Sequence, residues 1–265
     1  MVRWLVALLV TAAAVALLWR PLFAWWCLDA GNLAFLRGDR VTAAADFVRG
    51  LRLEPGWRAL LEDHGRAVLD AEPAVALEDF RSAACGEPCT AEQGDAESRI
   101  GRFQDAIDDY LAAHAVERVG GAVDHLANEG RFDDAIGLER ALADRLGGGM
   151  LAMADLASAY YAIGQLDDRA ADAATTSPPA ASTAARARGA RAAAYRQDAI
   201  RSFKRASQLA PFNEGYLLSL GFAESTVGDK RSARAAFERV LDLHPHESDA
   251  ERGLAQLDPS APNSN

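Results

Sequence analysis

Two stretches near opposite ends of the chain share one spacing of small, aromatic and proline residues. In each stretch the steps are seven residues from glycine to glycine, five to alanine, four to phenylalanine and eight to proline. One copy consists of Gly31, Gly38, Ala43, Phe47 and Pro55, and the other of Gly221, Gly228, Ala233, Phe237 and Pro245. A spacing kept over so many positions indicates an internally repeated fold, in which each unit buries its apolar face against its neighbour.

The spacing resembles the tetratricopeptide repeat (TPR), a helix–turn–helix unit of about 34 residues. Weaker copies lie between the two clear ones, and in the fourth unit Glu139 takes the aromatic position. The other positions of the weaker copies are Ala71, Ala76, Phe80 and Pro88; Gly94, Gly101, Ala106 and Tyr110; Gly130 and Ala135; and Ala157, Gly164, Ala199, Phe203 and Pro211. The resemblance implies an all-α protein, an α-solenoid of about six repeats over residues 24–257, followed by a disordered tail at 258–265.

The fifth unit is interrupted by extra residues. Gly164, which the resemblance places at the turn between the two helices of this unit, and Ala199 are 35 residues apart, where the repeat has a step of five. The additional segment, at about 168–197, is rich in alanine, proline and arginine and includes AATTSPPAAST at 173–183. Because the stretch at 173–183 offers no side chains that would pack a core, we expect the insertion to be disordered. The alternative for its last part is that the alanine- and arginine-rich stretch at 184–196 lengthens the second helix of the unit.

Composition agrees with an all-α fold and argues against one class of partner. Hydrophobic residues make up 50% of the chain but aromatic residues only 8%, so the core must rest on alanine and leucine, which are strong helix formers. The formal net charge is −10. A surface of this sign repels phosphate backbones, and we therefore expect no nucleic-acid partner.

An apolar segment precedes the repeats. Residues 4–19 form a run of 16 uncharged residues, and residues 21–26 extend the apolar surface, so residues 4–26 predict contact with a membrane. We expect residues 1–23 to form one transmembrane helix in a bacterial inner or cell membrane. A short basic leader before an apolar run favours repeats on the extracytoplasmic side, which we expect, whereas the arginines that follow the run favour the cytoplasmic side. The alternative is a cleaved signal peptide, which would leave a secreted or periplasmic soluble protein.

Cys85 and Cys89 form the one local motif with several chemical possibilities. Their spacing allows a disulfide in an oxidising compartment and unpaired thiols in a reducing one, while a metal or redox role needs further ligands that the sequence does not place nearby. The histidines and the paired aspartates fit turns and helix starts, and no phosphate-binding loop is present. We expect no catalytic residue, no cofactor and no metal, hence a protein that is not an enzyme.

In the resembled family, the first helix of each unit lines a concave groove that binds partner proteins. The resemblance places these residues in that groove: Asn32, Asp95, Asp124, Leu151, Ser158, Tyr161, Phe222 and Ser225. Of the lysine and asparagine clamp by which some members bind carboxylates, only Asn32 is matched. The aspartates at the centre and the apolar residues at the distal end favour a basic or apolar peptide instead.

These features predict a non-enzymatic, membrane-anchored scaffold or adaptor. It would bind a partner protein in or next to the membrane, for instance during assembly of a membrane or cell-envelope complex. A soluble adaptor released by signal cleavage is the first alternative. An enzyme whose site carries no recognisable motif is the second.

Overall fold

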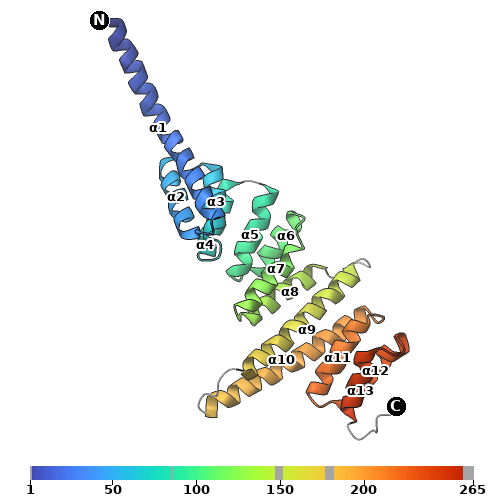
Figure 1. The fold of residues 1–265 in the computed structure, drawn as a ribbon. Coiled ribbons are helices and arrows are strands. Elements are labelled where there is room, and N and C mark those ends of the chain that lie inside the picture. The colour runs from blue at the N-terminus through green and yellow to red at the C-terminus, as the bar shows by residue number, and fades with distance from the viewer. Residues whose placement is uncertain (1, 85, 147–151, 177–181, 259–265) are drawn as a thin grey trace. The chain divides into compact units, whose positions relative to one another are not determined.

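The computed structural model describes residues 2–84, 86–146, 152–176 and 182–258 (Figure 1). Over these ranges the chain forms thirteen helices and no strand, which confirms the all-α prediction. The chain divides into two compact units, Met1–Val119 and Gly120–Asn265. Each unit has its own clusters of buried apolar residues.

The first unit is a series of helices that pack in chain order. They are α1 (Val2–Leu36), α2 (Arg40–Leu53), α3 (Arg58–Val68), α4 (Pro73–Ala83), α5 (Glu87–Arg99) and α6 (Phe103–Ala112). Each helix from α1 to α5 contacts the next one along the chain. Its core has one cluster around Phe47 and Leu60 and another around Leu77 and Phe80. Helical hairpins that follow one another in this way are what the solenoid prediction requires.

The second unit continues the pattern and includes two long helices, α9 and α10. The unit boundary falls at the start of α7, and the helices are α7 (Arg118–Asn128), α8 (Phe132–Leu146), α9 (Ala152–Thr176), α10 (Ser182–Leu209), α11 (Glu214–Thr226), α12 (Lys230–Leu243) and α13 (Ser248–Leu257). From α8 to α13 each helix contacts the next, and α13 also contacts α11. The short helix α13 therefore covers the last pair of the series.

One contact recurs in five helix pairs: an aromatic ring from the second helix lies directly on a glycine of the first. The contacts are Gly31 with Phe47, Gly65 with Phe80, Gly94 with Tyr110, Gly164 with Phe203, and Gly221 with Phe237. A Cβ atom added at any of these glycines would lie 2.4–2.8 Å from a ring carbon. Protein interiors are too closely packed to allow that overlap, so the ring and the missing side chain are mutually required.

The turns inside the first and last repeats have the same conformation. Gly38 and Gly228 adopt φ values of +81° and +84°, in the left-handed region that glycine enters without strain. In both turns the backbone N–H of the next residue donates to the carbonyl oxygen five residues before it, at 3.0 and 2.9 Å. That next residue is Asp39 or Asp229, whose carboxylate accepts from the first turn of the following helix. Gly38 and Gly228, the second glycines of the two clear copies, therefore lie in turns, as a helix–turn–helix repeat requires.

Two units depart from the predicted register. Gly65, which the spacing did not identify, lies under Phe80. It precedes its ring by 15 residues in the sequence, whereas Gly31, Gly94 and Gly221 precede theirs by 16. Gly164 was expected in a turn but lies inside α9, under Phe203. In both units the packing of the two helices decides which glycine lies under the ring. A fixed spacing along the sequence does not predict that glycine.

The predicted disordered insertion is largely helical. Of residues 168–197, those up to Thr176 belong to α9 and those from Ser182 to α10, while 177–181 lie outside the described residues. The two helices lie side by side (Figure 1), and Ala170, Ala171 and Ala192 are buried. Alanine has the highest helix propensity, and its small side chain lets two helices approach closely, so an alanine-rich segment extends the hairpin.

The N-terminal helix also differs from the prediction. Helix α1 runs through Pro21 without a break. Its later part packs in the first unit, where Ala24, Cys27 and Ala34 are buried. In the part of the chain that the structure describes, no helix combines the length and apolar character needed to cross a membrane. The predicted transmembrane helix at 1–23 and the single-pass membrane localisation are therefore wrong.

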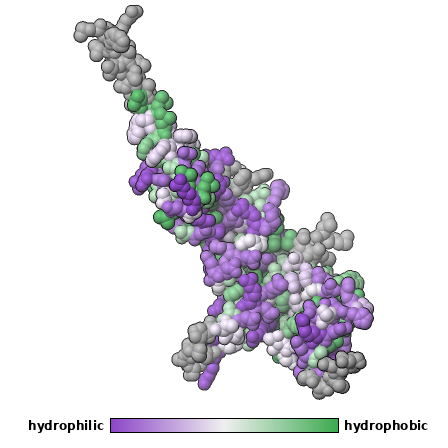
Figure 2. All heavy atoms as spheres, in the orientation of Figure 1, coloured by the Kyte–Doolittle hydropathy of each residue, from purple (hydrophilic) through white to green (hydrophobic). Residues whose placement is uncertain are grey.

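Apolar side chains remain exposed along the middle of α1. They are Val15, Leu18, Trp19, Leu22, Phe23, Trp25 and Trp26 (Figure 2). Figure 2 shows apolar atoms on this stretch of α1, where the helix extends past the packed helices of its unit. The described part of the first unit leaves this strip uncovered.

The structure shows different states for the two cysteines that it describes. Cys89 is buried and disulfide-bonded, whereas Cys27 is a buried free thiol. Cys85, the predicted partner of Cys89, lies outside the described residues. Its pairing with Cys89 therefore stays a prediction.

Thiol titration tests this pairing. We expect one reactive thiol, that of Cys27, in the denatured protein without reductant, and all three cysteines to react after reduction. In the variant Cys27→Ser, no thiol should react before reduction. Three reactive thiols without reductant, in protein prepared from an oxidising compartment, would contradict the disulfide.

The ring-on-glycine contact predicts where the second unit is most sensitive to truncation. Phe237 is fully buried, and added Cβ atoms on Gly221 of α11 and Gly253 of α13 would lie 2.6 and 2.5 Å from its ring. We expect Phe237→Ala to lower the free energy of unfolding by roughly 3–5 kcal/mol, measured by urea denaturation, because it leaves a cavity between three helices. The exposed Phe212 provides the control. Phe212→Ala should change the free energy of unfolding by less than about 0.5 kcal/mol. Equal unfolding midpoints for the two variants would refute this packing.

Candidate functional site

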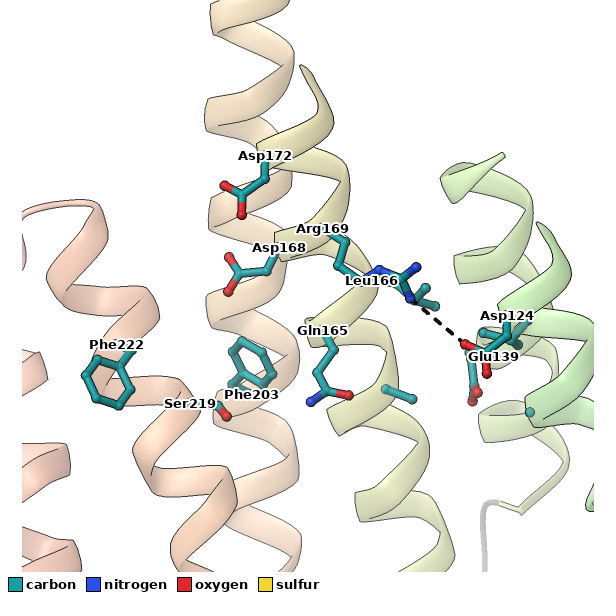
Figure 3. Close-up of a pocket in the computed structure, with 13 residues that line it drawn as sticks. Asp124, Glu139, Gln165, Leu166, Asp168, Arg169, Asp172, Phe203, Ser219 and Phe222 are labelled. Carbon is teal, nitrogen blue, oxygen red and sulfur yellow. Dashed lines mark ion pairs between the residues drawn. The ribbon is translucent and has the colours of Figure 1, made fainter. Parts of the chain in front are cut away.

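The second unit contains an open cavity of about 590 Å³ along α9. Residues of α7 and α8 line it on one side and residues of α11 on the other, with Phe203 of α10 between them (Figure 3). Most of its lining comes from α7, α9 and α11, the first helices of three successive pairs. The lining residues are Gly120, Val123, Asp124, Glu139, Ala162, Gln165, Leu166, Asp168, Arg169, Asp172, Phe203, Ser219 and Phe222.

Glu139 takes the position in the fourth helix pair that an aromatic ring holds in the others. Val123 lies sixteen positions before it, the offset that separates Gly221 from Phe237, and both Val123 and Glu139 line the cavity. The side chain of Glu139 is only 6% exposed, and its Oε2 atom has no hydrogen-bond partner. Burial raises the pKa of this carboxyl to about 7, since loss of solvation disfavours the charged form.

Further carboxylates follow the cavity along α7 and α9. Asp124 of α7 pairs with Arg169 of α9 at 3.9 Å, the dashed line in Figure 3. The pKa of Asp168 is raised by burial and by the neighbouring charge of Asp172. Together with Glu139, four carboxyl groups and one guanidinium line the cavity. Its walls are therefore acidic.

Aromatic residues form the end of the cavity nearest α11. The ring of Phe222 meets that of Phe237 edge-on at a centroid distance of 5.0 Å. Tyr161, which lies behind Phe203 at 5.6 Å, also contacts Tyr216 at 4.7 Å and accepts a hydrogen bond from the Ser219 hydroxyl at 3.2 Å. These contacts hold Phe203 and Phe222 in fixed positions, so the cavity has an apolar end with a defined shape.

The structure brings together only part of the predicted groove. Asp124 and Phe222 line the cavity, while Tyr161 supports it from behind. Ser158 and Ser225 do not line it, and Leu151 lies outside the described residues. Asn32 and Asp95 belong to the first unit.

Asp95 in particular is engaged within the first unit. Its carboxylate accepts a hydrogen bond from the Tyr110 hydroxyl at 2.9 Å and forms an ion pair with Arg118. Burial is the main cause that raises its pKa. Because both carboxylate oxygens already have partners, Asp95 contributes to the packing of its own unit.

The groove prediction missed Glu139, Gln165, Asp168, Asp172 and Phe203. Most of these residues lie on α9 or α10. The sequence predicts a disordered insertion from about residue 168, so the predicted first helix of this unit ends too early. The departure of Glu139 from the aromatic pattern was visible in the sequence. That departure was the signal for an opening in the core at this unit.

Comparisons with known proteins give similarity to repeat proteins of low sequence identity. No protein-family model and no curated protein matches the sequence. The chain is similar to the crystal structure of the MamA protein, with 17% identity, a TM-score of 0.34, and coverage of 89% of this chain and 96% of that one.

Two further solved structures have TPR in their descriptions. YrrB, a TPR protein with an unusual peptide-binding site, has 12% identity and a TM-score of 0.32, over 85% of this chain and 89% of that one. A TPR repeats protein from Bacteroides fragilis has 14% identity and a TM-score of 0.38, over 77% and 98%. In the present chain, the evidence for repeat units is the ring-on-glycine contact and the turn conformation that recur along it.

Burial of Glu139 makes the stability of the second unit depend on pH. Because its folded-state pKa of about 7 lies above the ordinary 4.5, the folded protein holds this proton more tightly, and stability falls as pH rises through that interval. The other charged groups that line the cavity with Glu139 are Asp124, Asp168, Arg169 and Asp172. We expect Glu139→Gln to raise the free energy of unfolding by roughly 3 kcal/mol near pH 8 and by almost nothing near pH 4.

Urea denaturation at the two pH values measures this difference. Asp144→Asn, on the exposed face of the same helix, is the matched control and should leave stability unchanged at both. An equal gain for Glu139→Gln at both pH values would show that removal of a buried charge is not its cause.

Proposed function

We propose that this protein is a non-enzymatic scaffold whose second unit binds an extended peptide segment of another protein. The observation that carries the proposal is the cavity along α9. It is open, it is lined mainly by the first helices of three successive pairs, and it combines an acidic wall with an apolar end. Such a surface suits a peptide, which offers side chains of different character at short intervals along its length.

The role of the binding unit is to hold a partner within a larger assembly. Helical hairpins stacked in series produce an extended surface on which a partner can bind. The aromatic contacts behind Phe203 and Phe222 fix the cavity before a peptide arrives, which lowers the entropy that binding has to overcome. We therefore propose assembly of a multiprotein complex as the biological task.

Selection from a phage-displayed library of random peptides, with the full-length protein immobilised, tests this function. We expect enriched peptides to bind in the cavity and to lose at least about tenfold in affinity for Gln165→Trp, because an indole would occupy the space. Gln165 is exposed and lines the cavity. The affinity is measured by fluorescence anisotropy of synthetic copies of the enriched peptides.

Gln197→Trp is the matched control for this test. Gln197 is also exposed, lies on α10, and does not line the cavity. Its substitution should leave the affinity unchanged. Failure to enrich any peptide whose binding depends on Gln165 would contradict the proposed function.

A further inference from the structure

The fourth helix pair of the solenoid lacks the ring that closes the other pairs. In five pairs a phenylalanine or tyrosine ring fills the space above a glycine. Here the corresponding positions hold Glu139 and Val123, and both face the cavity. A carboxylate is shorter than a phenyl ring and carries a charge, so this pair leaves an opening with a polar group at its base.

The Glu139 carboxylate is placed where a partner is required. Its Oε2 atom is buried and has no hydrogen-bond partner, and an unpaired buried charge is strongly unfavourable. The cation that lines the same cavity is Arg169, which pairs with Asp124 and lies over the ring of Phe132 at 6.0 Å from its centroid. Figure 3 shows the Arg169 side chain directed from α9 toward Asp124.

We propose that Glu139 anchors one positively charged side chain of the bound peptide, a lysine or arginine, while an apolar side chain of the same peptide packs on Phe222. This inference rests on the proposed peptide-binding function and specifies its ligand. The N–H group of the incoming cation supplies the hydrogen bond that Oε2 lacks. Charged hydrogen bonds of this kind are about twice as strong as neutral ones.

The surrounding charges favour the same occupant. Asp168 and Asp172 lie along α9 beside the path into the cavity, and Asp124 lies across it on α7. Carboxylates that line an enclosed surface raise the local concentration of cations and repel acidic peptides. The apolar end at Phe222 then selects, among basic peptides, those with a hydrophobic residue close to the charge.

The anchor also predicts how binding changes with pH. The charged groups that line the same cavity as Glu139 are Asp124 on α7 and Asp168, Arg169 and Asp172 on α9, whereas α10 and α11 contribute Phe203, Ser219 and Phe222. The pKa of Glu139 is raised to about 7 by burial, and a lysine stays protonated well above that. Affinity for a basic peptide should therefore rise between about pH 6 and pH 8 as Glu139 ionises.

The experiment uses fluorescein-labelled synthetic copies of the peptides selected on the full-length protein. For each peptide, the lysine or arginine is replaced by norleucine in a second probe. We expect Glu139→Gln to weaken the basic probe by about 10- to 100-fold, which is the value of a charged hydrogen bond, and to leave the norleucine probe unchanged. Asp144→Asn is the charge control on the same helix, and circular dichroism verifies that each variant is folded.

The outcomes separate this inference from the proposed function. If enriched peptides require Gln165 but contain no basic residue, or if Glu139→Gln binds the basic probe as tightly as the wild type, the anchor is refuted and the peptide-binding groove stands. A basic probe whose affinity rises with pH equally in wild type and Glu139→Gln also refutes the anchor. Absence of any peptide that depends on Gln165 refutes both proposals.

Discussion

A ring stacked on a glycine is the contact on which this structure depends. The glycine removes a side chain from the first helix, so the second helix can approach until an aromatic ring lies on bare backbone. The ring in turn fills the volume that would otherwise be a cavity, and Phe47, Phe80, Tyr110, Phe203 and Phe237 are almost completely buried. Because the contact fixes both the distance and the register of a pair, its repetition builds hairpins of similar geometry that stack in series.

The candidate site arises where this contact is missing. In the fourth pair Glu139 replaces the ring, and the surface that opens there combines acidic side chains with the aromatic rings of Phe203 and Phe222. A buried carboxylate without a partner lowers stability, and Asp167 on the adjacent helix has the same character, with both carboxylate oxygens buried and unpartnered. Residues that act against stability are concentrated at functional sites more often than elsewhere. In this protein they lie beside the groove.

The sequence by itself predicted the parts of the fold that depend on nearby residues. The helical class, the left-handed turns at Gly38 and Gly228, and the buried rings of the first and last units all follow from spacings of a few residues. The sequence led to wrong predictions where one local pattern is compatible with two different structures. An alanine-rich segment forms a helix when a second helix lies beside it, as for residues 168–176 and 182–197, and an apolar run that opens a chain belongs here to a helix that continues into the first unit.

What the sequence determined, then, is the period of the repeat, because helix periodicity and turn conformation are set by residues close together in the chain. Only the tertiary structure decided which side chains share the groove. Glu139, Asp168 and Phe222 are far apart in sequence and come together through the packing of α8, α9 and α11. Their burial and charge environment are properties of that packing, and no spacing within a single helix contains them.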